Sequence, residues 1–185
     1  MNLKNVPSGI NIPNDIYVII EIPYHSYPIK YEIDKETQNL FVDRFLPTAM
    51  LYPCNYGYIN NTLSDDKDPL DVLIPIPYKL QYGCIIQCKP IGVLKMIDES
   101  GSDSKIIALP HNNISSEYQH INNINDISNS FKQQIIHFFQ HYKDLEKNKW
   151  VKIIGFEDTQ SAQQEIIKSI KNFLKTNNLN INDNI

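Results

Sequence analysis

The first 110 residues consist of short apolar runs, rich in β-branched side chains, that prolines and polar turns interrupt. Residues 15–23 form one such run, DIYVIIEIP, and residues 29–34 alternate strictly between apolar and charged side chains. Both patterns predict strands, because successive side chains of a strand point to opposite faces. Further strands are expected over residues 40–45, 71–76, 84–89, 92–96 and 105–109. So many short strands with little helix between them favour a small, mainly antiparallel barrel.

The later part of the chain has a helical period. From residue 126 to about residue 147, apolar side chains recur every three or four residues, which predicts an amphipathic helix with Asp126 or Ser128 as its N-cap. Residues 161–175 predict a second helix with an apolar side. Residues 176–185 are rich in asparagine and patternless, so we expect a disordered tail. The sequence therefore predicts one mainly β (α+β) domain over residues 1–175, with two helices packed outside the barrel.

The composition excludes several classes of protein. The 185 residues are 42% hydrophobic and 21% charged, which supplies a packed core and argues against disorder of the whole chain. A net charge of −4 argues against a general binder of nucleic acid or of anionic membranes. No apolar run approaches the roughly 20 residues that cross a bilayer. The three cysteines form no CxxC pair, and their odd number suggests reduced thiols. We therefore expect a cytoplasmic protein.

Four acidic residues fall within residues 65–71 (DDKDPLD), directly before an apolar strand. Like charges this close are tolerated when they are solvated or when a cation neutralises them, and a solvated turn is the simpler interpretation. An EF-hand is excluded, because the sixth loop position is not glycine and the twelfth is Pro77. Zinc is disfavoured, because no cysteine or histidine lies nearby. Oxygen donors alone suit Mg²⁺ or Mn²⁺.

Other charged groups are individually weak signals. Residues 98–103 (DESGSD) form a second acidic group followed by Lys105, and alone they predict a hairpin turn. Lys30 and Glu32 share the polar face of the alternating strand, and Glu21 lies near the end of the first apolar run. The basic and phenolic candidates are Arg44, which is the only arginine of the chain, and Tyr52, Tyr56, Tyr142 and Lys143.

Taken together and in order, these segments from residue 3 to about residue 160 closely resemble the soluble inorganic pyrophosphatases of family I, the bacterial type. The matching segments are EIP at 21–23, PIKYEID at 28–34, DR at 43–44, YPCNYGY at 52–58, DKDPLD at 66–71, GVLKM at 92–96, DE at 98–99, DSK at 103–105 and HYKDLE at 141–146. The acidic signature with the YPCNYGY run before it is highly specific. Lys67 departs from the pattern, because the family usually has a small residue there.

The resemblance implies a closed five-stranded OB-like barrel that hydrolyses pyrophosphate to two phosphates with several Mg²⁺ ions, for which Mn²⁺ is a possible substitute. It implies metal ligation by Asp66, Asp71, Asp98 and Asp103, with Glu21 and Glu32 close by, and Asp68 as the general base. It implies substrate contacts from Lys30, Arg44, Tyr56, Lys105, Tyr142 and Lys143. Bacterial relatives assemble as hexamers, so we expect a homohexamer with His137 and His141 at an interface.

The departure at Lys67 and the identity of the substrate leave alternatives open. A small residue at position 67 implies a positive φ or tight space, and we expect Lys67 to point to solvent and to be catalytically idle. Two other functions stay open. An OB-type barrel can bind oligonucleotides, although the charged clusters here are mainly acidic. A metal-dependent phosphatase or nuclease acting on a larger phosphate ester is the closer alternative.

Overall fold

The computed structural model describes residues 3–178. The strands and α-helices of this part of the chain are, in order, β1 (Ile16–Ile22), β2 (Ile29–Ile33), β3 (Leu40–Phe45), β4 (Asn55–Ile59), β5 (Leu70–Ile74), β6 (Ile85–Asp98), β7 (Gly101–Ser102), β8 (Lys105–Pro110), α1 (Asn129–His141), β9 (Val151–Glu157) and α2 (Thr159–Thr176). None of the helices in residues 3–178 is long and apolar enough to cross a membrane.

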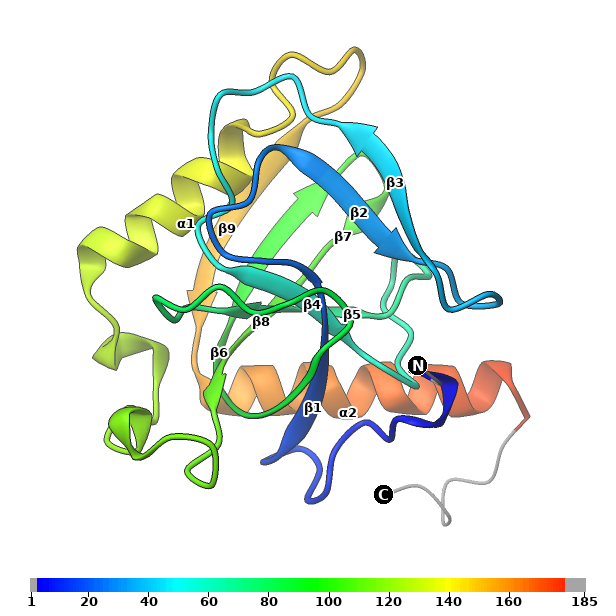
Figure 1. The fold of residues 1–185 in the computed structure, drawn as a ribbon, viewed down its shortest axis with the longest axis vertical. Helices are drawn as coiled ribbons and strands as arrows, with labels where there is room; N and C mark the ends of the chain where they lie inside the picture. Colours follow the sequence, from blue (N-terminus) through cyan, green and yellow to red (C-terminus); the bar gives the residue numbers. More distant parts are fainter. Residues whose placement is uncertain (1–2, 179–185) are drawn as a thin grey trace.

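Five strands close into a ring in the order β1-β4-β5-β8-β6, and β6 pairs back with β1 (Figure 1). These pairings are antiparallel except between β5 and β8, which run parallel. The 14 residues of β6 make it long enough to pair with β1, β8, β7 and β9 along its length. The predicted closed set of five strands, mainly antiparallel, is confirmed.

The core lies inside this ring and under the two helices. β1, β4, β5 and β8 are buried at almost every residue, as expected for strands covered on both faces. α1 buries Ile135, Phe138 and Phe139 and lies against β9, whereas α2 buries Ile166 and Ile170 and lies against β6 (Figure 1). The prediction that both helices pack outside the strands is confirmed.

The helix boundaries differ from the prediction at three points. α1 begins after Ser128, one of the two predicted N-caps, whose Oγ accepts a hydrogen bond from the Phe131 amide, but it ends at His141 instead of near residue 147. The chain turns there, and Leu145, predicted to lie on the apolar face, is 78% exposed. α2 starts at Thr159 and includes Thr176, which was predicted to open the tail. The tail from residue 179 lies outside the described residues.

The strand predictions were wrong at three places. Residues 84–89 and 92–96 belong to one strand, β6, because a register shift between Pro90 and Gly92 carries the pairing with β8 past the proline. β4 and β9 were not predicted. In β4, Gly57 crosses β1 so closely that a Cβ atom would lie 2.1 Å from the Ile19 carbonyl oxygen. That close approach explains a glycine inside a strand.

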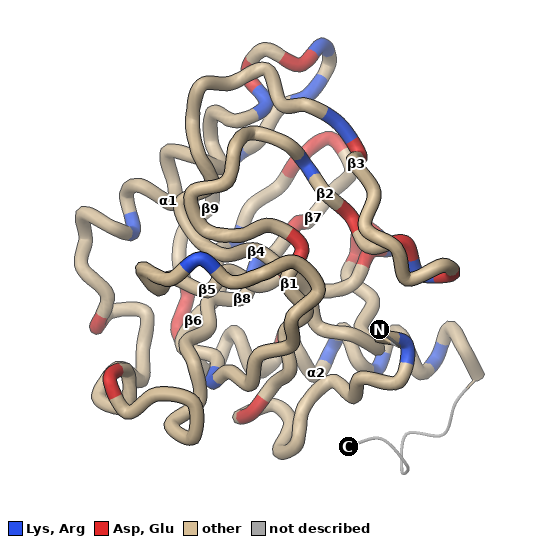
Figure 2. Tube along the Cα trace, viewed as in Figure 1, with Lys and Arg blue, Asp and Glu red and all other residues tan. Residues whose placement is uncertain are grey.

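β2 and β3 form a separate two-stranded sheet that lies beside the ring (Figure 1). The two strands are antiparallel, and Lys30 of β2 pairs with Arg44 of β3. Acidic and basic positions gather around β2, β3 and β7 (Figure 2). This hairpin therefore brings charged side chains of the N-terminal third next to those carried by the ring.

Candidate active site

A cleft of about 280 Å³ opens where the β2–β3 hairpin, the 65–71 segment and the turn after α1 meet. Every site residue that the family resemblance implied lines it: Glu21, Lys30, Glu32, Arg44, Tyr56, Asp66, Asp68, Asp71, Asp98, Asp103, Lys105, Tyr142 and Lys143. Tyr52, the remaining phenolic candidate, is buried and does not line the cleft. Lys35, Tyr58, Glu99 and Lys149 also line the cleft and were not predicted. Tyr58 and Glu99 lie inside segments quoted for the resemblance, Lys35 directly follows one, and Lys149 carries no local signal.

Asp71 and Asp103 meet at the floor of the cleft. The parallel register of β5 and β8 places Asp71 opposite Lys105. Lys105 Nζ donates to Asp71 Oδ2 at 2.7 Å and to Asp103 Oδ1 at 2.9 Å, and Tyr56 Oη donates to Asp71 Oδ2 at 2.5 Å. Burial works against the charge on Lys105, but the two carboxylates hold its pKa well above the usual value. Lys105 is therefore a permanent cation within the acidic floor.

The 65–71 segment forms a tight turn at the edge of the floor. The Asp68 carbonyl accepts from the Ser64 amide, and Asp66 Oδ1 accepts from the Asp68 amide at 3.0 Å. The Asp68 side chain is 71% exposed, and its Oδ1 lies 3.2 Å from Lys35 Nζ. Lys67 has φ +73° and is exposed, and it does not line the cleft. Of the two expectations for position 67, a positive φ is therefore the one found in this chain.

Several carboxyl groups of the cleft are hard to ionise. Burial raises the pKa of Glu21 to about 8, even though Glu21 Oε1 accepts from the Ile33 amide. Burial, helped by Asp103, Asp71 and Asp68, raises the pKa of Asp66 to about 6. Burial also raises the pKa of Asp71, against the opposing effect of Lys105. Buried carboxylates that repel one another favour the binding of a cation between them.

The donor chemistry of this floor fits Mg²⁺ or Mn²⁺. Asp66, Asp71 and Asp103 offer only carboxylate oxygens, which are the ligands of hard divalent cations. Within residues 3–178, no three His, Cys, Asp or Glu side chains are gathered tightly enough to hold a metal ion as they stand. Asp71 and Asp103 instead share the Lys105 ammonium group. This pairing shows that the floor already concentrates negative charge around a cation.

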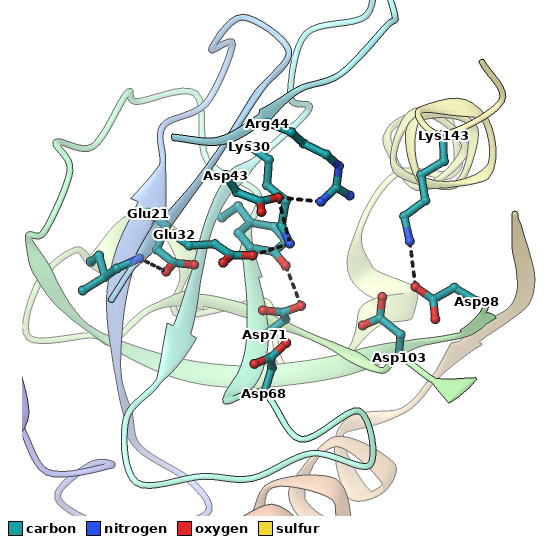
Figure 3. Close-up of polar contacts among 12 residues, drawn as sticks. Glu21, Lys30, Glu32, Asp43, Arg44, Asp68, Asp71, Asp98, Asp103 and Lys143 are labelled. Atoms are coloured by element: carbon teal, nitrogen blue, oxygen red, sulfur yellow. Dashed lines mark hydrogen bonds and ion pairs between the residues drawn. The ribbon is translucent and has the colours of Figure 1, made fainter. Parts of the chain in front are cut away.

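Basic side chains face the floor from two directions (Figure 3). From the hairpin, Lys30 pairs with Glu32 at 2.5 Å, and Arg44 Nη1 lies 2.5 Å from Asp43 Oδ2. From the turn after α1, Lys143 Nζ donates to Asp98 Oδ2 at 2.7 Å. Lys30 and Arg44 therefore lie above Asp71 and Asp68, and Lys143 reaches the floor from the opposite wall (Figure 3).

The end of α1 shapes that opposite wall. Tyr142 follows the last helical residue and stacks on Phe138, with 5.4 Å between the ring centroids. This packing buries most of Tyr142 while the residue still lines the cleft. Although burial raises the pKa of Asp98, hydrogen bonds from Lys143 and the Ser100 amide hold it below the usual value. Asp98 is therefore ionised at neutral pH, in contrast to Glu21.

His137 and His141 lie on α1, away from the cleft. Their ring centroids are 4.9 Å apart, and His141 Nδ1 lies 2.8 Å from Asp144 Oδ2. His137 lines a shallow surface hollow with His25 and Leu51. No third zinc ligand accompanies the two histidines in the described part of the chain. They remain candidates for an interface between subunits.

Comparison with known proteins identifies the family of this chain. The family model described as inorganic pyrophosphatase matches residues 18–174. The inorganic pyrophosphatase of Wigglesworthia glossinidia brevipalpis is 61% identical over 98% of this chain and 100% of its own length. That of Escherichia coli K12 is 60% identical over 92% of this chain and 97% of its own.

Solved structures lead to the same family. An inorganic pyrophosphatase of Coxiella burnetii superposes with a TM-score of 0.88 at 47% identity, over 91% of this chain and 99% of that one. The Thermus thermophilus enzyme gives a TM-score of 0.87 at 38% identity, over 94% and 99%. The predicted OB-like fold is thereby confirmed. The chain belongs to the inorganic pyrophosphatase family, of the bacterial family I type, and is an inorganic diphosphatase.

Proposed function

We propose that the chain hydrolyses inorganic pyrophosphate to two phosphates with bound Mg²⁺, and that Asp68 is the general base. The observation that carries this proposal is the meeting of all thirteen predicted side chains in one cleft. Acidic residues form its floor and basic residues its walls. A cleft of this kind supports binding of a small, densely charged anion through bridging cations.

Asp66, Asp71, Asp98 and Asp103 would hold the Mg²⁺ ions, with Glu21 and Glu32 at the margin. Bound Mg²⁺ supplies charge neutralisation and lowers the pKa of water. The protein's own contribution is to fix these carboxylates: β5 fixes Asp71, the turn of residues 64–68 fixes Asp66, and the chain before β8 fixes Asp103. Lys105 donates to both Asp71 and Asp103, so it holds these two carboxylates side by side at the floor.

Asp68 is suited to accept a proton from the attacking water. Its carboxylate lies at the edge of the floor, next to Asp66, and remains open to solvent. The water oxygen attacks one phosphorus atom, Asp68 takes a water proton, and the bridging P–O bond breaks to release the second phosphate. An open carboxylate beside buried ones separates the role of base from the role of ligand.

Lys30, Arg44, Tyr56, Lys105, Tyr142 and Lys143 would bind the phosphoryl oxygens. Arg44 presents a planar guanidinium, which can donate two parallel hydrogen bonds to a phosphate. In the structure its Nη1 contacts Asp43 and its Nε lies 3.0 Å from Glu146 Oε2, so the side chain is held in place from both sides. This support favours a positioning of Arg44 that a flexible lysine would not reproduce.

The experiment that tests this function measures phosphate release from pyrophosphate, ATP, phosphomonoesters and DNA, each with Mg²⁺. Rapid release from pyrophosphate alone supports the proposal, and faster release from another ester supports the phosphatase or nuclease alternative. Asp68→Asn should lower turnover about 10²–10⁴-fold while leaving Mg²⁺ binding nearly intact. Glu36→Gln is the matched control, because Glu36 is exposed on the hairpin turn outside the cleft. Near-normal turnover of Asp68→Asn would exclude Asp68 as the base.

We further propose a homohexamer in the cytoplasm. The pair of His137, which is exposed, and His141, which is half-buried, together with the adjacent surface hollow, supports an interface on α1. The three cysteines are free thiols, as suits a reducing compartment.

A further inference from the structure

The second half of α2 contacts the acidic segment at three neighbouring points. The Ser169 carbonyl accepts a hydrogen bond from the Leu63 amide at 2.9 Å, and Asn172 Nδ2 donates to the Leu63 carbonyl at 3.3 Å. Lys168 Nζ donates to Asp65 Oδ2 at 2.6 Å. Asp65 directly precedes Asp66, so the helix holds the chain on the side from which it enters the catalytic turn.

Glu165 extends this contact to the other side of the floor. Its Oε2 accepts from Lys95 Nζ, which also donates to Ser104 Oγ at 3.3 Å, and its Oε1 lies 3.7 Å from Lys168 Nζ. Only 11% of the Glu165 side chain is exposed. Ser104 stands between Asp103 and Lys105 in the sequence. One carboxylate on α2 is therefore connected to both segments that carry the acidic floor.

We propose that Glu165 and Lys168 are positioning residues, which hold the Asp66 segment at the spacing from Asp103 that binds Mg²⁺. This inference rests on the proposed function of the cleft. Asp66, Asp71 and Asp103 repel one another, and burial strengthens that repulsion. If α2 opposes the separation of the two segments, Mg²⁺ does not have to draw them together on binding. Weakening these contacts from α2 then raises the Mg²⁺ concentration required for activity and leaves turnover at saturating Mg²⁺ nearly unchanged.

The sign of the effect separates positioning from simple electrostatics. Lys168 carries a positive charge near the floor, so its removal would by charge alone improve Mg²⁺ binding. A positioning role predicts instead that removal of Lys168 weakens Mg²⁺ binding. Lys171 is exposed on the same helix and forms no ion pair with the residues the structure describes. Lys171→Met therefore removes the same charge and leaves the contacts between α2 and the acidic segment intact. It is the matched control for Lys168→Met.

The experiment compares the Mg²⁺ concentration at half-maximal pyrophosphate hydrolysis in wild type, Lys168→Met, Glu165→Gln and Lys171→Met. Because the Lys168–Asp65 pair is partly exposed, we expect Lys168→Met to raise this concentration about twofold to fivefold. Glu165→Gln leaves Lys95 without its carboxylate, so we expect a rise of about tenfold. Lys171→Met should match wild type. In an Asp65→Asn background, Lys168→Met should have no further effect, because the pair is already broken.

Activity-independent measurements complete the test. Calorimetric titration with Mg²⁺ alone should show the same order of affinities, and amide hydrogen exchange of residues 63–71 should speed up in Lys168→Met and Glu165→Gln but not in Lys171→Met. An Mg²⁺ affinity in Lys168→Met equal to or higher than wild type, or additive effects with Asp65→Asn, would overturn the positioning role. If the wild type does not hydrolyse pyrophosphate, the proposed function fails, and calorimetry and exchange still decide whether α2 holds the segment.

Discussion

Replacing Glu21 with glutamine tests how strongly the cleft opposes negative charge. Glu21 is 8% exposed at the end of β1, and its Oε1 accepts from the Ile33 amide at 2.7 Å. Glutamine has the same shape and keeps an acceptor for that bond. The substitution removes a carboxyl group. Burial, helped by nearby Asp71, raises the pKa of this group from 4.5 to about 8.

The magnitude follows from proton linkage. An unfolded chain releases the Glu21 proton near pH 4.5, whereas the folded protein keeps it to about pH 8. Between these values the folded state binds more protons, so its stability falls as the pH rises. Each unit of raised pKa corresponds to about 1.4 kcal/mol, which gives a loss of order 5 kcal/mol by pH 8. The Glu21→Gln protein lacks this loss. The free energy of unfolding of the variant minus that of wild type should therefore increase steadily from pH 5 to pH 8.

The assay is urea unfolding of both proteins in EDTA at pH 5, 6.5 and 8, at one protein concentration so that assembly does not vary. Other raised groups, such as Asp66, titrate in both proteins and cancel in the difference. Saturating Mg²⁺ should stabilise wild type more than the variant at pH 8, because a cation favours the ionised carboxylate. A difference between variant and wild type that stays constant from pH 5 to pH 8 would refute the account of Glu21.

Three further predictions concern single sites. Arg44→Lys should lower kcat/KM for pyrophosphate at least about tenfold, because a point charge replaces a two-pronged donor; unchanged kcat/KM would show that charge alone suffices. Lys67→Gly should keep full activity and raise the free energy of unfolding by about 1 kcal/mol, because glycine accepts the positive φ; a loss of hydrolysis would make Lys67 part of the site. Light scattering from pH 8 to pH 5 should show a hexamer that weakens in mild acid, because acid adds positive charge to an interface that contains histidines; a monomer at every pH would exclude that interface.

Local pattern was sufficient for some elements and not for others. The strict alternation of residues 29–34 identified β2, whose apolar side chains end in buried Ile33 on one face, while the other face carries Lys30 and exposed Glu32. β9 escaped prediction because two adjacent isoleucines and Gly155, at φ +142°, interrupt its alternation, and its register with β6 shifts there. β4 was not predicted because its sequence, NYGYI, contains a glycine and no β-branched run, although all five residues are buried. The closure of the ring depends on pairings between distant residues, which no local period encodes.

The site, too, could be predicted only in part from local sequence pattern. Each acidic cluster alone predicted only a turn, and the ordered resemblance to a family made the site predictable. The contact of Asp71 with Lys105 depends on a parallel register between β5 and β8 that spacing does not reveal. Lys149 reaches the cleft only because α1 ends at His141 and the chain then turns, whereas the helical pattern predicted six more residues of helix. The hydrogen bonds from α2 to the acidic segment join residues about 100 positions apart and have no signature in the sequence.

We propose that the carboxylates at the floor of the cleft hold the divalent cations that act on pyrophosphate. Anomalous diffraction from crystals soaked in Mn²⁺ measures this directly, because the peaks locate the metal without reference to activity. We expect a strong peak among Asp66, Asp71 and Asp103, and we expect that peak to be lost in Asp71→Asn. A structure whose Mn²⁺ peaks all lie outside the cleft, in protein that still hydrolyses pyrophosphate, would contradict it.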